Sequence, residues 1–127
     1  MTPSQTSVEL TEIIFPEHCN HYGTLFAGNG LLLMSKAAFL AARNFADSNM
    51  VIVKCSDAEF LAPVPQGRVL TLHAEVTRVG RTSLTVTVSG HSKDLGGLAE
   101  PVLKAQFEMV AVDAQGKPQE ITKSITS

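Results

Sequence analysis

Apolar and polar residues alternate along much of the chain, which is the pattern of strands with one buried face. The clearest case is residues 82–89, where Leu84, Val86 and Val88 alternate with serine and threonine. The Gly80-Arg81 pair predicts a turn before this strand. The predicted strands cover residues 8–14, 51–60, 68–78, 82–89 and 102–112.

A different pattern fills the region after the first predicted strand, where residues are apolar on nearly every helical face. We expect a helix from Asn29, a favourable N-cap, to about Asn44, with Asp47 just beyond its end. A helix that is apolar on all sides must be buried on all sides, and only a surrounding sheet can achieve that in 127 residues. The predicted fold class is therefore α+β, with one long central helix wrapped by a curved antiparallel sheet of about five strands.

The length predicts a single domain over residues 1–127. We expect its core at about residues 8–112, followed by a polar tail over 113–127 that frays from Pro118. Because a lone curved sheet leaves its edges uncovered, we expect at least a homodimer.

Charge and hydropathy exclude some partners. The formal net charge of −2, with scattered basic residues, argues against a nucleic-acid partner. The longest apolar run, residues 31–42, contains Ser35 and Lys36 and is too short to span a membrane. The N-terminus has no apolar stretch typical of a signal peptide, and Cys19 and Cys55 read as free thiols, so we expect a cytoplasmic protein.

A polar, glycine-rich loop over residues 16–28 leads into the helix. Backbone N–H groups at a helix start point at whatever binds there, so this loop is the predicted site. His18, Cys19 and His21 supply at most three metal ligands with no fourth nearby, so we expect no metal.

Four segments, in this order, resemble the hot-dog-fold acyl-CoA thioesterases: the loop 19–28, the following helix, Phe60–Val64 with Gly67, and Val79–Ser83. The resemblance covers roughly residues 8–112. It implies that two chains pair into one continuous sheet, that the active sites lie between subunits, and that dimers assemble into tetramers or hexamers. It implies an acyl-CoA substrate and no cofactor apart from the coenzyme A of that substrate.

The resemblance also implies roles for individual residues. Asn20 matches the family's loop asparagine, which is an aspartate in some branches, and is expected to position the attacking water. Its amide could also hold its own loop in an Asx-turn. Gly28 and Asn29 match the helix start, whose backbone N–H groups hold the thioester oxygen. The residues expected to contact the substrate are His21, Gly23 and Phe26 in the loop, and Arg81, Thr82 and Ser83 near the coenzyme A phosphates and pantetheine arm.

One position departs from the family pattern. The family's catalytic carboxylate lies two turns into the helix, commonly as Met-Asp-Lys-Ala, whereas this chain has serine at that position, Ser35. A serine needs a partner base to become a nucleophile, and it can instead bond to the carbonyl one turn back. His21, Asp57 or Glu59 could supply a displaced base.

Two functions follow from this departure: a thioesterase in which Ser35, from the partner chain's helix, takes the acid's place, or an acyl-CoA binding module that lost its chemistry. A hot-dog hydratase or dehydratase fits poorly, because this helix has no carboxylate.

Overall fold

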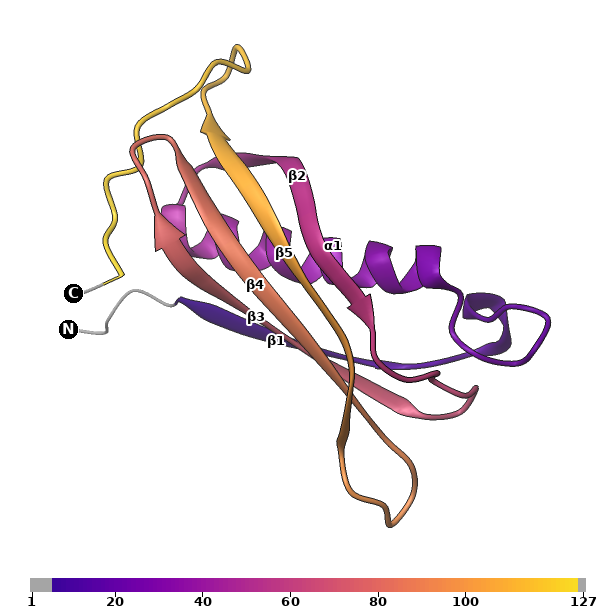
Figure 1. The fold of residues 1–127 in the computed structure, drawn as a ribbon. Helices are drawn as coiled ribbons and strands as arrows, with labels where there is room; N and C mark the ends of the chain where they lie inside the picture. The colour runs from indigo at the N-terminus through magenta and orange to yellow at the C-terminus, as the bar shows by residue number, and fades with distance from the viewer. Residues whose placement is uncertain (1–5, 126–127) are drawn as a thin grey trace.

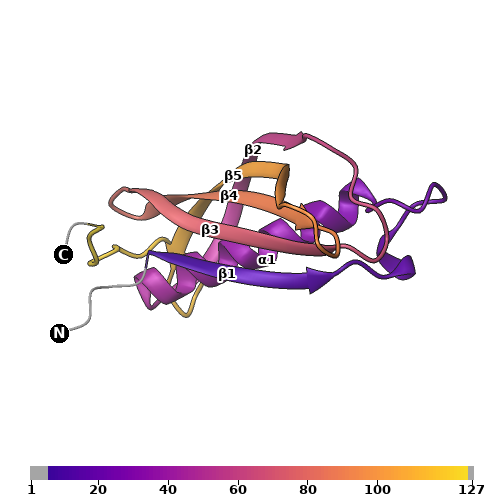
Figure 2. The same ribbon diagram turned by 90° about the horizontal axis from the view of Figure 1, so that it is seen from below.

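Five antiparallel strands form one sheet, and a long helix lies along one face of it (Figures 1 and 2). This computed structural model describes residues 6–125. Its elements are β1 (Ser7–Ile13), a short 3-10 helix η1 (Pro16–His18), α1 (Ala27–Ala46), β2 (Asn49–Phe60), β3 (Val69–Val79), β4 (Ser83–Lys93) and β5 (Glu100–Val112), with sheet order β1-β3-β4-β5-β2. The predicted α+β class, with one long helix on a five-stranded antiparallel sheet, is confirmed.

The core lies between the helix and the concave face of the sheet. Alternate residues of the central strands point inward, as Leu70 and Leu72 do on β3 and Val86 and Val88 do on β4. The helix turns a row of alanines toward them, and these small side chains allow α1 to contact all five strands. Each large side chain buried there contributes roughly 1.5–3 kcal/mol of hydrophobic stabilisation.

The helix is longer than predicted at both ends, and Asn29 is not its N-cap. The N-cap is Phe26, in an extended conformation, and α1 begins at Ala27. Asn29 lies within the first turn, where its side chain bonds to the preceding loop instead of capping a helix amide. At the other end Asp47 adopts the left-handed conformation and its N–H bonds to the Arg43 carbonyl, which lets the helix run on to Ala46.

The prediction that the helix is buried on every side is wrong for the single chain. Leu32 is 51% exposed and Leu40 is 38% exposed, and they lie two turns apart on one stripe of α1. The reason is geometric, because a five-stranded sheet covers one side of a helix and leaves the opposite stripe open. This stripe is an apolar surface that lacks cover in one protomer.

The C-terminal segment is not frayed from Pro118. Asp113 and Gly116 form a turn that reverses the chain after β5. The returning residues then bond to the sheet end, with Gln119 N–H donating to the Ala111 carbonyl and Ile121 N–H to the Arg81 carbonyl. No helix within residues 6–125 is long and apolar enough to cross a membrane.

Candidate functional site

The loop between β1 and α1 is fixed to the segment that follows β2. The Leu25 N–H donates to the Val64 carbonyl at 2.8 Å, and the Gln66 N–H donates to the Gly23 carbonyl at 3.0 Å. Gly23 has a φ of +78°, a conformation that glycine adopts without strain. The loop is therefore held in one shape before any ligand arrives.

Asn20 organises this loop from inside. Its Oδ1 accepts hydrogen bonds from the Tyr22 N–H at 2.9 Å, the Thr24 N–H at 3.3 Å and the Thr24 hydroxyl at 3.2 Å. The Asx-turn that the sequence offered as an alternative is therefore present. Within the described residues the Asn20 Nδ2 donates no hydrogen bond, so the amide keeps a donor that a ligand or water can use.

The start of α1 offers three backbone donors without intrahelical partners. The first helical bond runs from the Gly30 N–H to the Phe26 carbonyl, so the N–H groups of Ala27, Gly28 and Asn29 belong to the open first turn. Phe26 supplies no side-chain cap. The Asn29 Nδ2 donates to the His18 carbonyl at 2.9 Å, which ties this turn to the loop.

Asn20 and the helix start meet at one hollow. The hollow has a volume of about 270 Å³ and is bounded mainly by apolar side chains from the loop and from the segment that follows β2. Its lining residues are Asn20, Leu25, Ala27, Phe60, Leu61, Ala62, Pro63, Val64 and Leu103. Ala27, the first residue of α1, is the member of the open first turn that lines this hollow, and Gly28 and Asn29 follow it in the chain. A polar amide and a helix start beside a mainly apolar hollow form the usual composition of a small-molecule site.

Ser35 lies two turns further along α1, in a second hollow of about 470 Å³. The other lining residues are Lys36, Phe39, Leu40 and Ile52. The Ser35 hydroxyl donates to the Leu32 carbonyl at 2.7 Å, which is the backbone bond expected for an unactivated serine. In the part of the chain that the structure describes, no carboxylate or imidazole bonds to Ser35.

The other candidate bases lie elsewhere. The His18 Nδ1 accepts from the Phe15 N–H at 3.1 Å, and His21 packs on Tyr22 with ring centroids 3.9 Å apart. Asp57 and Glu59 line a separate surface hollow, where Glu59 lies 3.7 Å from the Lys104 ammonium. Among residues 6–125 no three metal-binding side chains converge.

The predicted coenzyme A residues Arg81–Ser83 lie at the turn between β3 and β4. This turn is at the opposite end of the sheet from the loop between β1 and α1, which contains Asn20 (Figure 1). Val69 begins β3 beside the site loop and Val79 ends β3 beside this turn. At about 3.3 Å per residue, the strand separates the two regions by roughly 30 Å. A single chain therefore does not bring the two groups of predicted site residues together.

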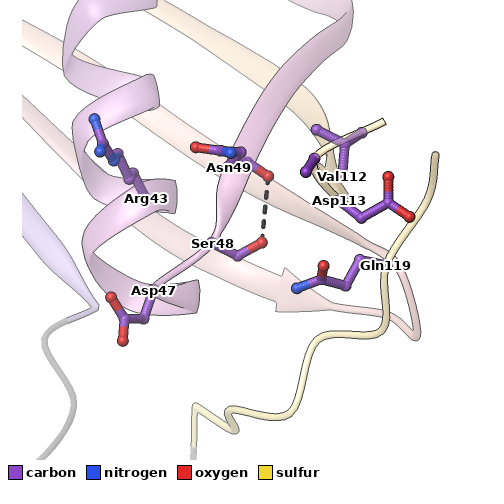
Figure 3. Close-up of a pocket in the computed structure, with 8 residues that line it drawn as sticks. Arg43, Asp47, Ser48, Asn49, Val112, Asp113 and Gln119 are labelled. Atoms are coloured by element: carbon purple, nitrogen blue, oxygen red, sulfur yellow. Dashed lines mark hydrogen bonds between the residues drawn. The ribbon is translucent and has the colours of Figure 1, made fainter. Parts of the chain in front are cut away.

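A polar hollow of about 310 Å³, which the sequence did not predict, lies at that opposite end (Figure 3). The C-terminal ends of α1 and β5, the start of β2 and the returning tail build it, so only the tertiary fold could show it. Its polar lining residues are Arg43, Asp47, Ser48, Asn49, Asp113 and Gln119. The tail that contributes Gln119 also bonds to Arg81, which places this hollow beside the Arg81–Ser83 turn.

Comparison with known proteins places this site in context. Residues 22–99 match the family model of the thioesterase superfamily. Acyl-CoA thioester hydrolase YciA of Escherichia coli is 28% identical over 121 residues, which cover 91% of this chain and 90% of that protein.

Two solved structures share the fold over most of the chain. An apo-hexameric acyl-CoA thioesterase is 32% identical with a TM-score of 0.91, over 96% of this chain and 80% of that one. The acyl-CoA hydrolase of Staphylococcus aureus, in complex with butyryl coenzyme A and coenzyme A, is 25% identical with a TM-score of 0.89, over 94% and 74%.

Proposed function

Because this chain belongs to the thioesterase superfamily, we propose that it hydrolyses an acyl-CoA thioester to the free acid and coenzyme A. The observation that carries the proposal is the meeting of Asn20 and the open first turn of α1 at one hollow. The E. coli relative is an acyl-CoA thioester hydrolase and the S. aureus relative is an acyl-CoA hydrolase, and both support the choice of substrate.

In this proposal the thioester carbonyl oxygen accepts hydrogen bonds from the Gly28 and Asn29 N–H groups. These donors stabilise the negative charge that develops on that oxygen when water adds to the carbonyl carbon. The Asn20 Nδ2 positions the water. The carbon–sulfur bond then breaks as the attacking water gives one proton to the departing sulfur and the other to solvent. The products are the carboxylate and the coenzyme A thiol.

We further propose that two chains pair through β2 to complete the site. β2 is one of the two edge strands of the sheet, and its first half is apolar, with Val53 60% exposed beside exposed Val51 and Ile52. An open apolar edge of this kind favours pairing with another strand. The hexameric relative supports self-association.

Antiparallel pairing of β2 with β2 of a second chain brings together the two groups of site residues that lie far apart within one chain. The Asn49 end of β2 lies beside the Arg81–Ser83 turn, and the Phe60 end lines the Asn20 hollow. A two-fold axis near the middle of β2 opposes these ends, so the Arg81–Ser83 turn of one chain meets the Asn20 loop of the other. The same pairing covers the exposed stripe of Leu32 and Leu40 and encloses the hollow beside Ser35.

A second function is favoured by the Ser35 hydrogen bond: binding of acyl-CoA without hydrolysis. The hydroxyl proton is directed to the Leu32 carbonyl and no described base takes it, so Ser35 is not set up to act in place of a carboxylate. We therefore expect turnover to be slow compared with that of relatives that have the acid.

The test measures release and binding separately. Purified protein is mixed with acyl-CoAs from acetyl to palmitoyl, and released coenzyme A is detected with a thiol-reactive dye. The exposed Cys55 would itself react with such a dye, so a Cys55→Ser variant provides the background. Calorimetry measures binding. Release supports hydrolysis; binding without release supports the second function; neither release nor binding contradicts both.

A further inference from the structure

Arg78 departs from the alternation of β3 just before the turn between β3 and β4. The residues of β3 with even numbers, from Leu70 to Val76, are buried in the core. The pairing of β3 with β4 shifts by one residue between Val76 and Arg78, so Thr77 is the extra residue of a β-bulge. Arg78 is therefore exposed on the outer face of the sheet instead of buried in the core. Bulges re-aim side chains in this way and are frequent beside functional sites.

The Arg78 guanidinium spans the base of the turn. Its Nη2 donates to the Ser83 hydroxyl at 3.2 Å and to the Glu108 carboxylate at 2.9 Å, and its Nε donates to the Thr85 hydroxyl at 2.8 Å. Thr85 is 6% exposed, and its hydroxyl donates in turn to Glu108. One planar cation therefore connects the base of the turn to β3, β4 and β5.

Gly80 leaves room for this guanidinium. A Cβ at Gly80 would lie 2.9 Å from the Arg78 Nη1, closer than a Cβ normally approaches another atom. It would also lie 3.2 Å from the Ser83 Oγ. A side chain at position 80 would therefore push the guanidinium away from the turn.

The tip of the same turn is fixed by its backbone. The Arg81 carbonyl accepts from the Ile121 N–H at 2.7 Å, and the Thr82 carbonyl accepts from the Ala111 N–H at 2.9 Å. The Arg81 side chain is exposed, and within residues 6–125 its guanidinium forms no ion pair and no hydrogen bond. Arg81 is therefore free to pair with an anionic group of a ligand.

We propose that Arg78 is a positioning residue for the phosphate groups of coenzyme A: by fixing the base of the turn, it holds Arg81 where Arg81 pairs with them. The inference rests on the proposed function, which supplies coenzyme A as the ligand and brings the turn of one chain to the Asn20 loop of the other. A turn that is already ordered loses little conformational freedom when the ligand binds, and this increases the affinity.

Positioning and simple charge attraction predict different behaviour for lysine at position 78. Charge attraction needs only a positive charge, which lysine also carries. Positioning needs the planar set of donors that reaches Ser83, Thr85 and Glu108 at once, and an ammonium does not have it. The change should affect only the phosphate-bearing part of the ligand, because the proposed contacts of the thioester are at the start of α1.

The experiment measures the Kd for coenzyme A by calorimetry in the wild type, Arg78→Gln and Arg78→Lys, with folding checked by circular dichroism. We expect both variants to bind coenzyme A about tenfold more weakly, which is the loss that one newly mobile side chain can cause. Where turnover is measurable, KM for acyl-CoA should rise by the same factor at unchanged kcat. Pantetheine, which lacks the phosphates, should bind all three proteins alike.

Two further variants sharpen the comparison. Gly80→Ala keeps the charge of Arg78 but displaces its guanidinium, so it should show the same weakening; it also serves if the Arg78 variants do not fold. Lys104→Gln is the matched control, because it removes another ion-paired cation, the partner of Glu59, and changes the net charge as Arg78→Gln does. It should bind coenzyme A like the wild type.

Wild-type affinity in Arg78→Lys or in Gly80→Ala would overturn the inference, because charge alone would then explain binding. An equal weakening of pantetheine binding, or of coenzyme A binding in Lys104→Gln, would overturn it as well. A wild type that binds coenzyme A without hydrolysing acyl-CoA contradicts the proposed hydrolysis and leaves the comparison of Kd values intact. A wild type that binds no coenzyme A contradicts both the proposed function and the inference.

Discussion

Ser35 and Leu32 are joined within one turn of α1, where the serine hydroxyl donates to the leucine carbonyl at 2.7 Å. The bond satisfies the polar group of a residue that lines a mainly apolar hollow. It also removes the hydroxyl proton from any role in catalysis until another base takes it. The bond therefore bears on which of the two proposed functions holds, since a serine bonded in this way favours binding without hydrolysis.

Restoring an acid at this position should increase hydrolysis. In Ser35→Asp the carboxylate cannot donate to the Leu32 carbonyl and is free to act as a general base toward water. We expect kcat/KM for acyl-CoA to rise by about 100-fold, within the range that general bases contribute. Ser35→Asn, of similar size but without a charge, is the control and should give no rise. Equal rates for the two variants would show that the rest of the machinery is absent.

Asn20 should affect stability and function through different atoms. Asn20→Ala removes the acceptor of three loop hydrogen bonds, and we expect unfolding free energy to fall by about 1–3 kcal/mol. Asn20→Asp keeps the acceptor but loses the Nδ2 donor. Urea denaturation should show near wild-type stability for Asn20→Asp, while acyl-CoA turnover falls. If both variants lose stability and turnover in parallel, Asn20 serves the loop alone.

The backbone donor at Gly28 can be removed without changing the helix. Gly28→Pro deletes the N–H in the first turn, where proline is tolerated. Gly28→Ala keeps the N–H and adds a Cβ that meets only the ring of Phe26, an exposed and movable side chain. We expect kcat to fall by roughly 100-fold in Gly28→Pro and little in Gly28→Ala. Similar rates for both would exclude this amide from catalysis.

A charge on the β2 edge should separate the chains. Val53→Lys places an ammonium on an apolar edge that the proposed dimer buries, whereas Val53→Thr retains β-branching without a charge. Sedimentation velocity should show dissociation for the lysine variant alone. Acyl-CoA release should be lost with it, because the site needs both chains. A lysine variant that remains associated contradicts the β2 pairing.

Glu108, on the outer face of the sheet, should make the stability of the protein depend on pH in the acid range. Partial burial alone would raise the pKa of Glu108, but hydrogen bonds from Thr85 and Arg78, with the charges of Arg78 and Lys54, hold that pKa below its ordinary value of 4.5. Because the pKa of Glu108 is lower in the folded protein than in the unfolded protein, its ionised carboxylate stabilises the fold at pH values above the unfolded pKa. This stabilisation is lost as the pH falls through the folded pKa.

Glu108→Gln should therefore be less stable than wild type at neutral pH, with the difference shrinking below about pH 4.5. Urea denaturation across a pH series measures the effect. Glu120→Gln, at an exposed glutamate of the tail, is the control and should follow the wild-type curve. A difference between Glu108→Gln and wild type that stays constant with pH would contradict the ion-pair origin.

The alternation of apolar and polar residues was sufficient to predict the strands, because it follows directly from the burial of one strand face. Leu84, Val86 and Val88 were predicted inward and are fully buried. The N-cap was misassigned because propensity favours asparagine, whereas the fold uses the Asn29 side chain to hold His18. The tail was predicted to fray because its sequence is polar. Its pairing depends on the Asp113 turn and on a strand end supplied by distant residues.

By itself the sequence determined the class of fold, the loop that enters the helix, and the serine at position 35, because each is a matter of residue type and spacing. Only the tertiary structure decided that the Ser35 hydroxyl bonds to the Leu32 carbonyl, that the Arg81 turn lies at the far end from Asn20, and that one stripe of α1 stays open. The physical reason is that hydrogen-bond partners and exposed surfaces depend on distances between residues far apart in the chain, which packing alone sets.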